Sequence, residues 1–356
     1  MSDFTLAYAA AAAALIGLMA YAVLAGADFG GGVWDLFATG PRRRLQRQAI
    51  ADAMGPVWEA NHVWMIFVIV VLFTCFPRGF AALGVALFVP FHLALLGIML
   101  RGAAFVFRGY DERAAARQRR RHGQRSTVWG AVFGVASLIA PFLLGAAFGA
   151  ITSGIIRVAA ADGRVSYVTA GAMPWLNLYS VSCGLLALST CAYLAAVYLT
   201  AETQDELRDD FRRRAIVAGT VTAALAAAVL VLARSEATWF FHRLISPQAW
   251  PVLAAGLLCF AASAWAVFTR RYHLSRVFAA GEIVLLLLGW GVSYQPYLVY
   301  PDITLVSSMA PRATVRFLLA TLPFGMAVLV PSLWLLLRVF KPTLVAPEGR
   351  SDRPSS

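Results

Sequence analysis

The feature of this sequence that most limits its fold is a series of long apolar runs. The first of them, residues 7–27, contains no charged side chain. About 20 such residues are enough to cross the hydrocarbon core of a bilayer as an α-helix. Backbone groups in lipid must bond within their own structure, and unbroken apolar runs of this length are typical of helices rather than of barrel strands. The sequence therefore predicts an all-α polytopic membrane protein.

The chain contains nine runs of this kind. We predict transmembrane helices over residues 7–27, 57–76, 80–100, 128–151, 174–199, 215–233, 250–268, 277–294 and 315–340. The glycines that begin at Gly26 are predicted to end the first helix, and the Phe76-Pro77 turn to separate the second from the third. Residues 1–340 are expected to form one membrane domain. Residues 341–356, rich in Pro, Ser and charge, are expected to be a disordered cytoplasmic tail.

Composition and charge exclude other classes of protein. Only 13% of the residues are charged, about half the usual fraction in a soluble domain. The net charge of +12 does not indicate a nucleic-acid partner, because the arginines lie in the loops between the apolar runs. The four cysteines lie inside apolar runs and form no C-x-x-C pair, so neither disulfides nor a thiolate metal site are predicted.

The distribution of basic residues predicts the orientation. If the N-terminus is outside, 23 of the 30 Lys and Arg residues fall on the inner side. Cytoplasmic loops of membrane proteins carry such an excess. We therefore predict an external N-terminus and a cytoplasmic C-terminus. The arginine-rich loop over 101–125 is expected to be partly helical and to lie against anionic lipids.

Two acids are predicted to share one depth at the inner side of the membrane. Asp28 follows the first run and Glu59 opens the second, within the stretch Trp58-Glu59-Ala60-Asn61-His62. Ionisable residues near lipid are costly and are candidates for function. Together, the two carboxyls could take up protons from the cytoplasm. The alternative is ordinary helix-end chemistry, with Asp28 in a turn and Glu59 favoured by the helix dipole.

One further acid and two histidines lie inside predicted spans. Glu282 is surrounded by apolar residues in the eighth run and must face a partner or water. His62 and His92 are the only histidines in spans, and a haem between them is one interpretation. The other interpretation of His92 is a helix–helix hydrogen bond. No metal site is predicted from the spacing of ligands.

Several stretches resemble subunit II of the cytochrome bd quinol oxidases. They are Gly26-Ala27-Asp28-Phe29-Gly30, Gly55-Pro56-Val57-Trp58-Glu59-Ala60-Asn61-His62-Val63-Trp64, the Phe76-Pro77 turn, the segment Leu100–Arg108, and the tyrosine-rich loop over 294–301. The commoner pattern in that family is Trp-Asp-x-Asn-Glu. Here Glu59 keeps the carboxyl, whereas His62 removes an acid, which indicates a divergent branch.

The resemblance implies an accessory subunit in the cytoplasmic membrane of a bacterium. In that family, subunit II forms a heterodimer with a haem-bearing subunit I, with small single-span subunits as further partners. The complex oxidises quinol and reduces dioxygen to water. Haem b and haem d belong to subunit I. Acids matching Asp28 and Glu59 are on a suggested proton route, and the residue matching Trp58 lies near a bound quinone in some members. Asn61 and His62, next to these positions, are further candidates for contact with a bound cofactor. A stand-alone haem-carrying cytochrome and a transporter remain the alternatives.

Overall fold

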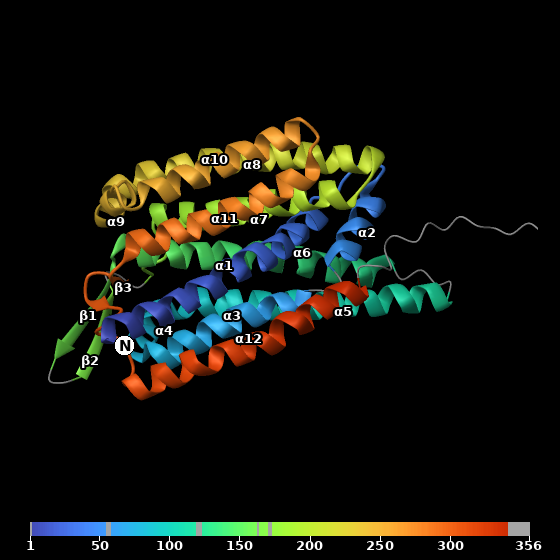
Figure 1. Cartoon of the computed structure of the whole chain (residues 1–356). Helices are drawn as coiled ribbons and strands as arrows, with labels where there is room; N and C mark the ends of the chain where they lie inside the picture. Colours follow the sequence, from blue (N-terminus) through green and yellow to red (C-terminus); the bar gives the residue numbers. More distant parts are fainter. Residues whose placement is uncertain (1, 55–57, 119–122, 162–163, 170–172, 341–356) are drawn as a thin grey trace, which may run out of the picture.

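The chain folds into a bundle of long helices that run roughly side by side (Figure 1). This computed structural model describes residues 2–54, 58–118, 123–161, 164–169 and 173–340. The helices are α1 (Asp3–Leu36), α2 (Arg43–Met54), α3 (Trp58–Cys75), α4 (Pro77–Ala86), α5 (Phe88–Gln118), α6 (Gly123–Ser153), α7 (Leu178–Glu202), α8 (Asp205–Glu236), α9 (Thr238–Leu244), α10 (Trp250–Phe268), α11 (Tyr272–Tyr294) and α12 (Arg312–Phe340). Two short antiparallel hairpins pair β1 (Ile156–Ala161) with β2 (Arg164–Thr169) and β3 (Tyr297–Val299) with β4 (Ile303–Thr304).

The predicted fold class is confirmed. Among the described residues, eight helices are long and apolar enough to cross a membrane, and the bent pair α3–α4 raises the number to nine. Helix α10 has the predicted bounds, and α7, α11 and α12 differ from their predicted bounds by a few residues. The predicted tail over 341–356 lies outside the described residues.

The prediction that glycines end the first helix was wrong. Helix α1 continues without a break through Gly26, Gly30 and Gly32 to Leu36. A Cβ atom at Gly30 would overlap the backbone carbonyl of Cys191 on α7, and one at Gly32 would overlap Ser137 on α6. The glycines therefore serve close helix packing rather than a turn. As a consequence, Asp28 lies inside a helix, about 12 Å before its end.

The predicted turn at Phe76-Pro77 is confirmed as the break after the second span, but the predicted start of the third span was wrong. Phe76 precedes a new helix that begins with Pro77, and this short helix, α4, is bent by 119° from α3. Proline fits the first turn of a helix because it has no N–H to donate. The next span is α5, which begins at Phe88 rather than at residue 80. This shift carries Arg101 and Arg108 from a predicted loop into the span.

Segments predicted as loops have regular structure. The arginine-rich stretch that starts at Arg101 continues α5 as a helix to Gln118, and α6 begins at Gly123. The stretch around Trp239, between two predicted spans, is the short helix α9. The stretches before α7 and before α12 form the two β-hairpins, which sequence periodicity did not reveal.

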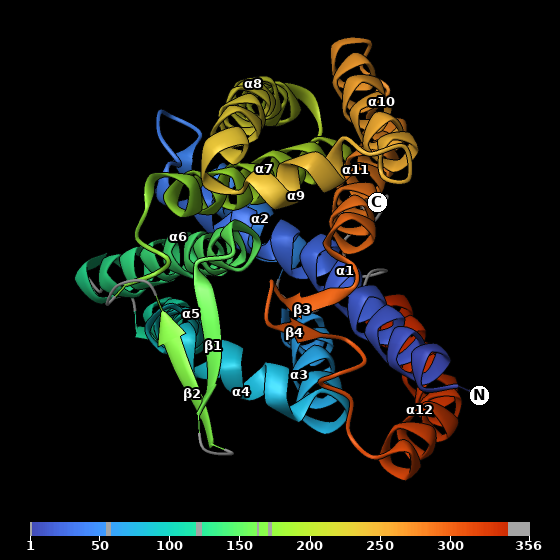
Figure 2. The ribbon, with the colours of Figure 1, turned by 90° about the vertical axis from the view of Figure 1, so that its left-hand side faces the viewer.

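Helix α1 is central to the bundle. Viewed from the end, it runs diagonally between the other helices (Figure 2). It packs against α3 and α6 on one side and against α7 and α11 on the other, while α12 lies beside its N-terminal half. Consecutive helices pair along the rest of the chain, namely α5 with α6, α6 with α7, α7 with α8, and α10 with α11. Side chains that point inward from α1 are therefore enclosed by several spans.

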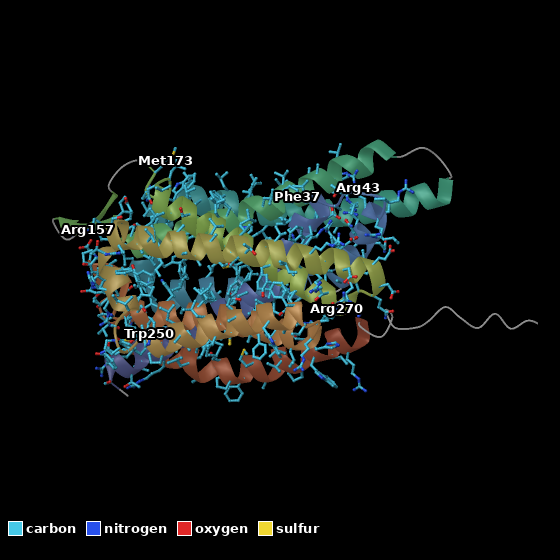
Figure 3. The ribbon with its side chains drawn as sticks, turned by 90° about the horizontal axis from the view of Figure 1, so that it is seen from above. Phe37, Arg43, Arg157, Met173, Trp250 and Arg270 are labelled. Atoms are coloured by element: carbon cyan, nitrogen blue, oxygen red, sulfur yellow. The ribbon has the colours of Figure 1, made fainter. Side chains whose placement is uncertain are left out.

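The two ends of the bundle differ in their charge. Arg43 and Arg270 lie toward one end, whereas Arg157 and Trp250 lie toward the other, which also carries the N-terminus (Figures 1 and 3). Helix α2 covers the end near Arg43 and Arg270, and we call this end of the bundle the arginine-rich end. By the distribution of basic residues this end is expected to be cytoplasmic.

Candidate functional site

A buried carboxyl–amide pair joins α1 to α3. The Asn61 side chain donates from Nδ2 to Oδ2 of Asp28 across 2.5 Å, and the same nitrogen lies 3.4 Å from the carbonyl oxygen of Leu24. Asp28 is 5% exposed and Asn61 is 4% exposed. Leu24 and Asp28 are four residues apart, so they share one face of α1. The amide of Asn61 is thereby aimed at the carboxyl group of Asp28.

The side chain of Arg101 contacts the backbone of the same residue, Asp28. Its Nη2 donates to the backbone carbonyl of Asp28 at 3.0 Å, and its Nε donates to Oγ of Ser137 on α6 at 3.1 Å. The guanidinium lies between the rings of Phe29 and Phe133, 5.2 and 5.1 Å from their centroids. Arg101 is only 2% exposed. A cation this deeply buried requires such partners, because its desolvation is costly.

A second acid–arginine pair lies two helical turns further along the same two helices. Arg108 of α5 donates from Nη1 to Oδ1 of Asp35 at 2.9 Å, and Asp35 is 1% exposed. Arg47 of α2 donates from Nε to the Asp35 carbonyl at 3.2 Å. Asp28 and Asp35 are seven residues apart, as are Arg101 and Arg108, so each pair occupies one helix face. The two levels form a polar column from the arginine-rich end to Asp28.

Comparison with protein-family models identifies the family. A family model described as "Cytochrome bd terminal oxidase subunit II" matches residues 6–340. The chain belongs to this family. It is therefore a multi-pass protein of the bacterial cytoplasmic membrane and a subunit of a terminal oxidase complex.

Individual bd oxidase subunits support the assignment. The chain is 25% identical over 334 residues to a putative cytochrome bd menaquinol oxidase subunit II of Bacillus subtilis, covering 90% of this chain and 91% of the relative. It is 28% identical over 205 residues to the cytochrome bd-I ubiquinol oxidase subunit 2 of Escherichia coli K12, covering 58% and 51%. The bd oxidase structure from Geobacillus thermodenitrificans has the same fold, with a TM-score of 0.78 at 21% identity over 95% of this chain and 99% of that one. The transporter and stand-alone cytochrome alternatives are not favoured.

The structure brings together only some of the residues predicted for the site in this bd subunit II chain. Asp28 and Asn61 are in direct contact. The backbone of Glu59 and Trp58 belongs to the first turn of α3, but their side chains lie outside the described part of the chain. Glu59 is two residues before Asn61, so the start of α3 lies at the level of Asp28.

The two histidines do not face a common site. His62 is partly buried, and its ring lies 6.0 Å from the ring centroids of both Phe29 and Tyr21. His92 is exposed on α5, and its Nδ1 lies 2.7 Å from the Phe88 carbonyl of the same helix. This contact of Nδ1 is thus within α5, and a hydrogen bond from His92 to another helix stays a prediction. This arrangement does not fit a haem held between His62 and His92, and no group of three or more His, Cys, Asp or Glu residues in the described chain could hold a metal ion.

Glu282 is buried on α11, with 5% of its surface exposed. Its Oε2 makes no hydrogen bond to any described residue. Nearby on the same helix, Ser275 lies next to Ser263 of α10, and the Ser263 hydroxyl is 2.6 Å from the hydroxyl of Tyr193. Glu282 and Ser275 are seven residues apart and share a face of α11.

Sequence reasoning missed Arg101, Arg108 and Asp35 as parts of the site. All three were assigned to connecting loops, because α1 and α5 were predicted to end too early. The available signal was the seven-residue spacing of both the acids and the arginines. That spacing is expected for side chains on one face of a continuous helix.

Proposed function

We propose that this chain is the accessory subunit of a bd-type quinol oxidase and that it conducts protons from the cytoplasm toward the site of oxygen reduction. The observation that carries the proposal is the buried Asp28 carboxyl, bonded by Asn61 at the level where α3 begins. Burying an acid on a central helix costs free energy, so a buried acid there is a candidate for function. Within the family, the reaction reduces dioxygen to water and consumes protons.

The chemistry of each residue in this route follows from its partners. Asn61 donates to Oδ2 of Asp28, which leaves Oδ1 as the oxygen that can take up and release a proton. Arg101 compensates the negative charge of the deprotonated carboxyl through the low-dielectric interior. Glu59 is the entry group, one turn or less from Asn61 at the start of α3. His62 replaces an acid of the commoner family pattern and removes one negative charge from the entrance.

We infer that the haems of the complex are held by the partner subunit. Among the described residues, the packing of His62 against Phe29 and the exposure of His92 leave no fitting pair of histidine axial ligands. We assign haem b and haem d to that partner subunit. Quinol and the small single-span subunits are further components expected of the complex. Trp58 remains the candidate neighbour of a bound quinone.

The proposal is tested by Glu59→Gln and Asp28→Asn in the assembled complex. We expect slower oxygen consumption with quinol in both variants, with the smaller effect for Asp28→Asn, and unchanged haem absorption. The unchanged haem spectrum separates a proton-transfer defect from failed assembly. Full turnover in Glu59→Gln would remove Glu59 from the route.

A further inference from the structure

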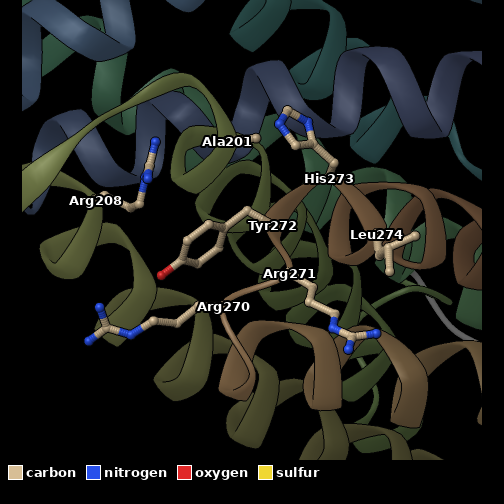
Figure 4. A pocket seen from close by; sticks show the side chains of 7 residues that line it. All are labelled: Ala201, Arg208, Arg270, Arg271, Tyr272, His273 and Leu274. Atoms are coloured by element: carbon tan, nitrogen blue, oxygen red, sulfur yellow. The ribbon is translucent and has the colours of Figure 1, made fainter.

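A basic hollow opens at the arginine-rich end, away from the Asp28 site. It has a volume of about 350 Å³ and lies where α7 and α8 meet the turn between α10 and α11. Its polar lining comes from Arg208 of α8, from Arg270 and Arg271 in the turn, and from Tyr272 and His273 at the start of α11 (Figure 4). The arginine side chains spread around the ring of Tyr272 rather than contacting one another (Figure 4). None of the described residues that line the hollow is acidic.

The arginines of the hollow keep most of their capacity to bind an anion. Arg208 donates from Nε to the Thr203 carbonyl at 2.7 Å, and its Cζ lies 5.2 Å from the ring centroid of Tyr272. Arg270 forms an ion pair with Asp209 at 3.7 Å, and both side chains are exposed, at 65% and 47%. Exposed ion pairs of this length contribute little to stability. Arg270 is therefore available to a stronger acceptor.

A second hollow at the same end provides a contrast. Arg42, which lines it, donates from Nε and Nη2 to the two carboxylate oxygens of Asp210 at 2.8 and 2.7 Å. Its Nη1 also donates to Glu206 at 2.7 Å. The acids of the protein already satisfy this cation. The hollow beside α11, by contrast, combines three arginines with a described lining that has no acid.

The first turn of α11 adds to the positive potential. Arg271 is the N-cap of this helix, and no side chain caps it. The first N–H groups of a helix have no partner within the helix, and the helix dipole favours an anion there. The Cζ of Arg271 lies 5.0 Å from the ring centroid of Trp265, and Trp265 is half exposed. Tryptophan and tyrosine are enriched where a bundle meets the lipid headgroups.

The backbone at Arg270 also sets this residue apart. Its φ is +60°, in the left-handed region that glycine adopts without strain. The residue follows the C-cap of α10, a position where glycine is the common choice. An arginine here retains its side chain at the expense of backbone strain. A glycine variant would remove the guanidinium and relax the turn at the same time.

We propose that this hollow binds the phosphate of an anionic phospholipid headgroup. Three spans end around it, at Glu202, Phe268 and Tyr272, which places it at the depth of the headgroups. Basic hollows between spans at this depth bind such lipids. The inference depends on the membrane fold and not on the proton route.

The test is native mass spectrometry of the detergent-solubilised complex with added phosphatidylglycerol. The test variant is Arg270→Gly with Arg271→Gln, and the control is Arg43→Gln with Arg44→Gln, which removes two exposed arginines of α2 at the same end. We expect roughly 30-fold weaker phosphatidylglycerol binding in the test variant, unchanged binding in the control, and weak binding of phosphatidylcholine to the wild type.

Three results would overturn the proposal. They are wild-type affinity for phosphatidylglycerol in the test variant, equal affinity of the wild type for phosphatidylcholine, and displacement of the lipid by equimolar inorganic phosphate, which would indicate a site for the free ion. If the test variant loses thermal stability, Arg270→Gly alone decides, because it is expected to keep the turn intact. Undiminished lipid binding in that single variant would also contradict the proposal.

Discussion

Arg101 on α5 donates to the backbone carbonyl of Asp28 on α1 at 3.0 Å, and the next pair along the same helices, Arg108 and Asp35, has the same separation in sequence. The equal offset requires α1 and α5 to run in the same direction. The column that results links the arginine-rich end to the buried carboxyl. Its side chains hold α1, α5 and α6 together through polar contacts in the interior of the bundle.

We predict that Arg101→Ala destabilises the complex strongly. The variant leaves the Ser137 hydroxyl and the Asp28 carboxyl without their cationic neighbour in a buried site, at a cost of about 3 kcal/mol or more. The midpoint of thermal unfolding of the solubilised complex measures the effect. Arg44→Gln, on the exposed side of α2, should leave the midpoint unchanged. A midpoint within 1 °C of wild type for Arg101→Ala would show that the buried contacts are not stabilising.

Exchanging Asp28 and Asn61 distinguishes a proton carrier from a structural residue. The double variant Asp28→Asn with Asn61→Asp keeps a carboxyl–amide hydrogen bond between α1 and α3 but moves the carboxyl to α3. We expect Asp28→Asn alone to slow oxygen reduction and the double variant to recover part of the rate. Recovery of thermal stability without any recovery of turnover would argue that the carboxyl must be on α1.

Replacing glycine by alanine should change the stability in opposite directions at Gly30, which is closely packed, and at Gly84, which is not. At Gly30 an added Cβ meets the backbone of Cys191, so Gly30→Ala must push α1 and α7 apart and should cost about 1–3 kcal/mol. Gly84 on α4 has open space around it, and Gly84→Ala should stabilise its helix by up to about 1 kcal/mol. Thermal unfolding of both variants checks the pair. Equal midpoints would contradict the close approach of α1 to α7.

The contact between the two β-hairpins should depend on pH. Asp302 accepts hydrogen bonds from Arg157 Nε at 2.9 Å and from the Val158 N–H at 2.8 Å. Partial burial alone would raise the pKa of Asp302, but these hydrogen bonds outweigh it and lower the pKa below its usual value. A carboxyl with a lowered pKa in the folded protein stabilises the fold above the unfolded pKa, and the contribution is lost as the pH falls through the folded pKa.

Acid titration of the solubilised complex measures this contribution. We expect the Arg157–Asp302 contact to weaken below about pH 4. Asp302→Asn should lack this stabilising contribution at every pH. Its stability should therefore fall less than that of the wild type as the pH is lowered. Identical acid profiles for Asp302→Asn and wild type would show that the contact does not contribute.

The sequence by itself determined the class of fold and the approximate position of most spans. Apolar runs long enough to cross a bilayer must form helices there, since the backbone has no other way to satisfy its hydrogen bonds in lipid. Helix α10 was therefore predicted with its correct bounds. The same reasoning placed Asp28 and the start of α3 at one depth, and the contact between Asp28 and Asn61 confirms that they are neighbours.

Only the tertiary structure decided how the interior is arranged. A glycine such as Gly30 is compatible with a helix end or with close packing, and the backbone of α7 against it selects packing. An arginine such as Arg101 is compatible with a loop, and its burial becomes acceptable only because α1 and α6 supply a carbonyl and a hydroxyl at hydrogen-bonding distance. Polar and small residues take their roles from partners distant in sequence, whereas hydrophobicity acts through the solvent and can be read along the chain.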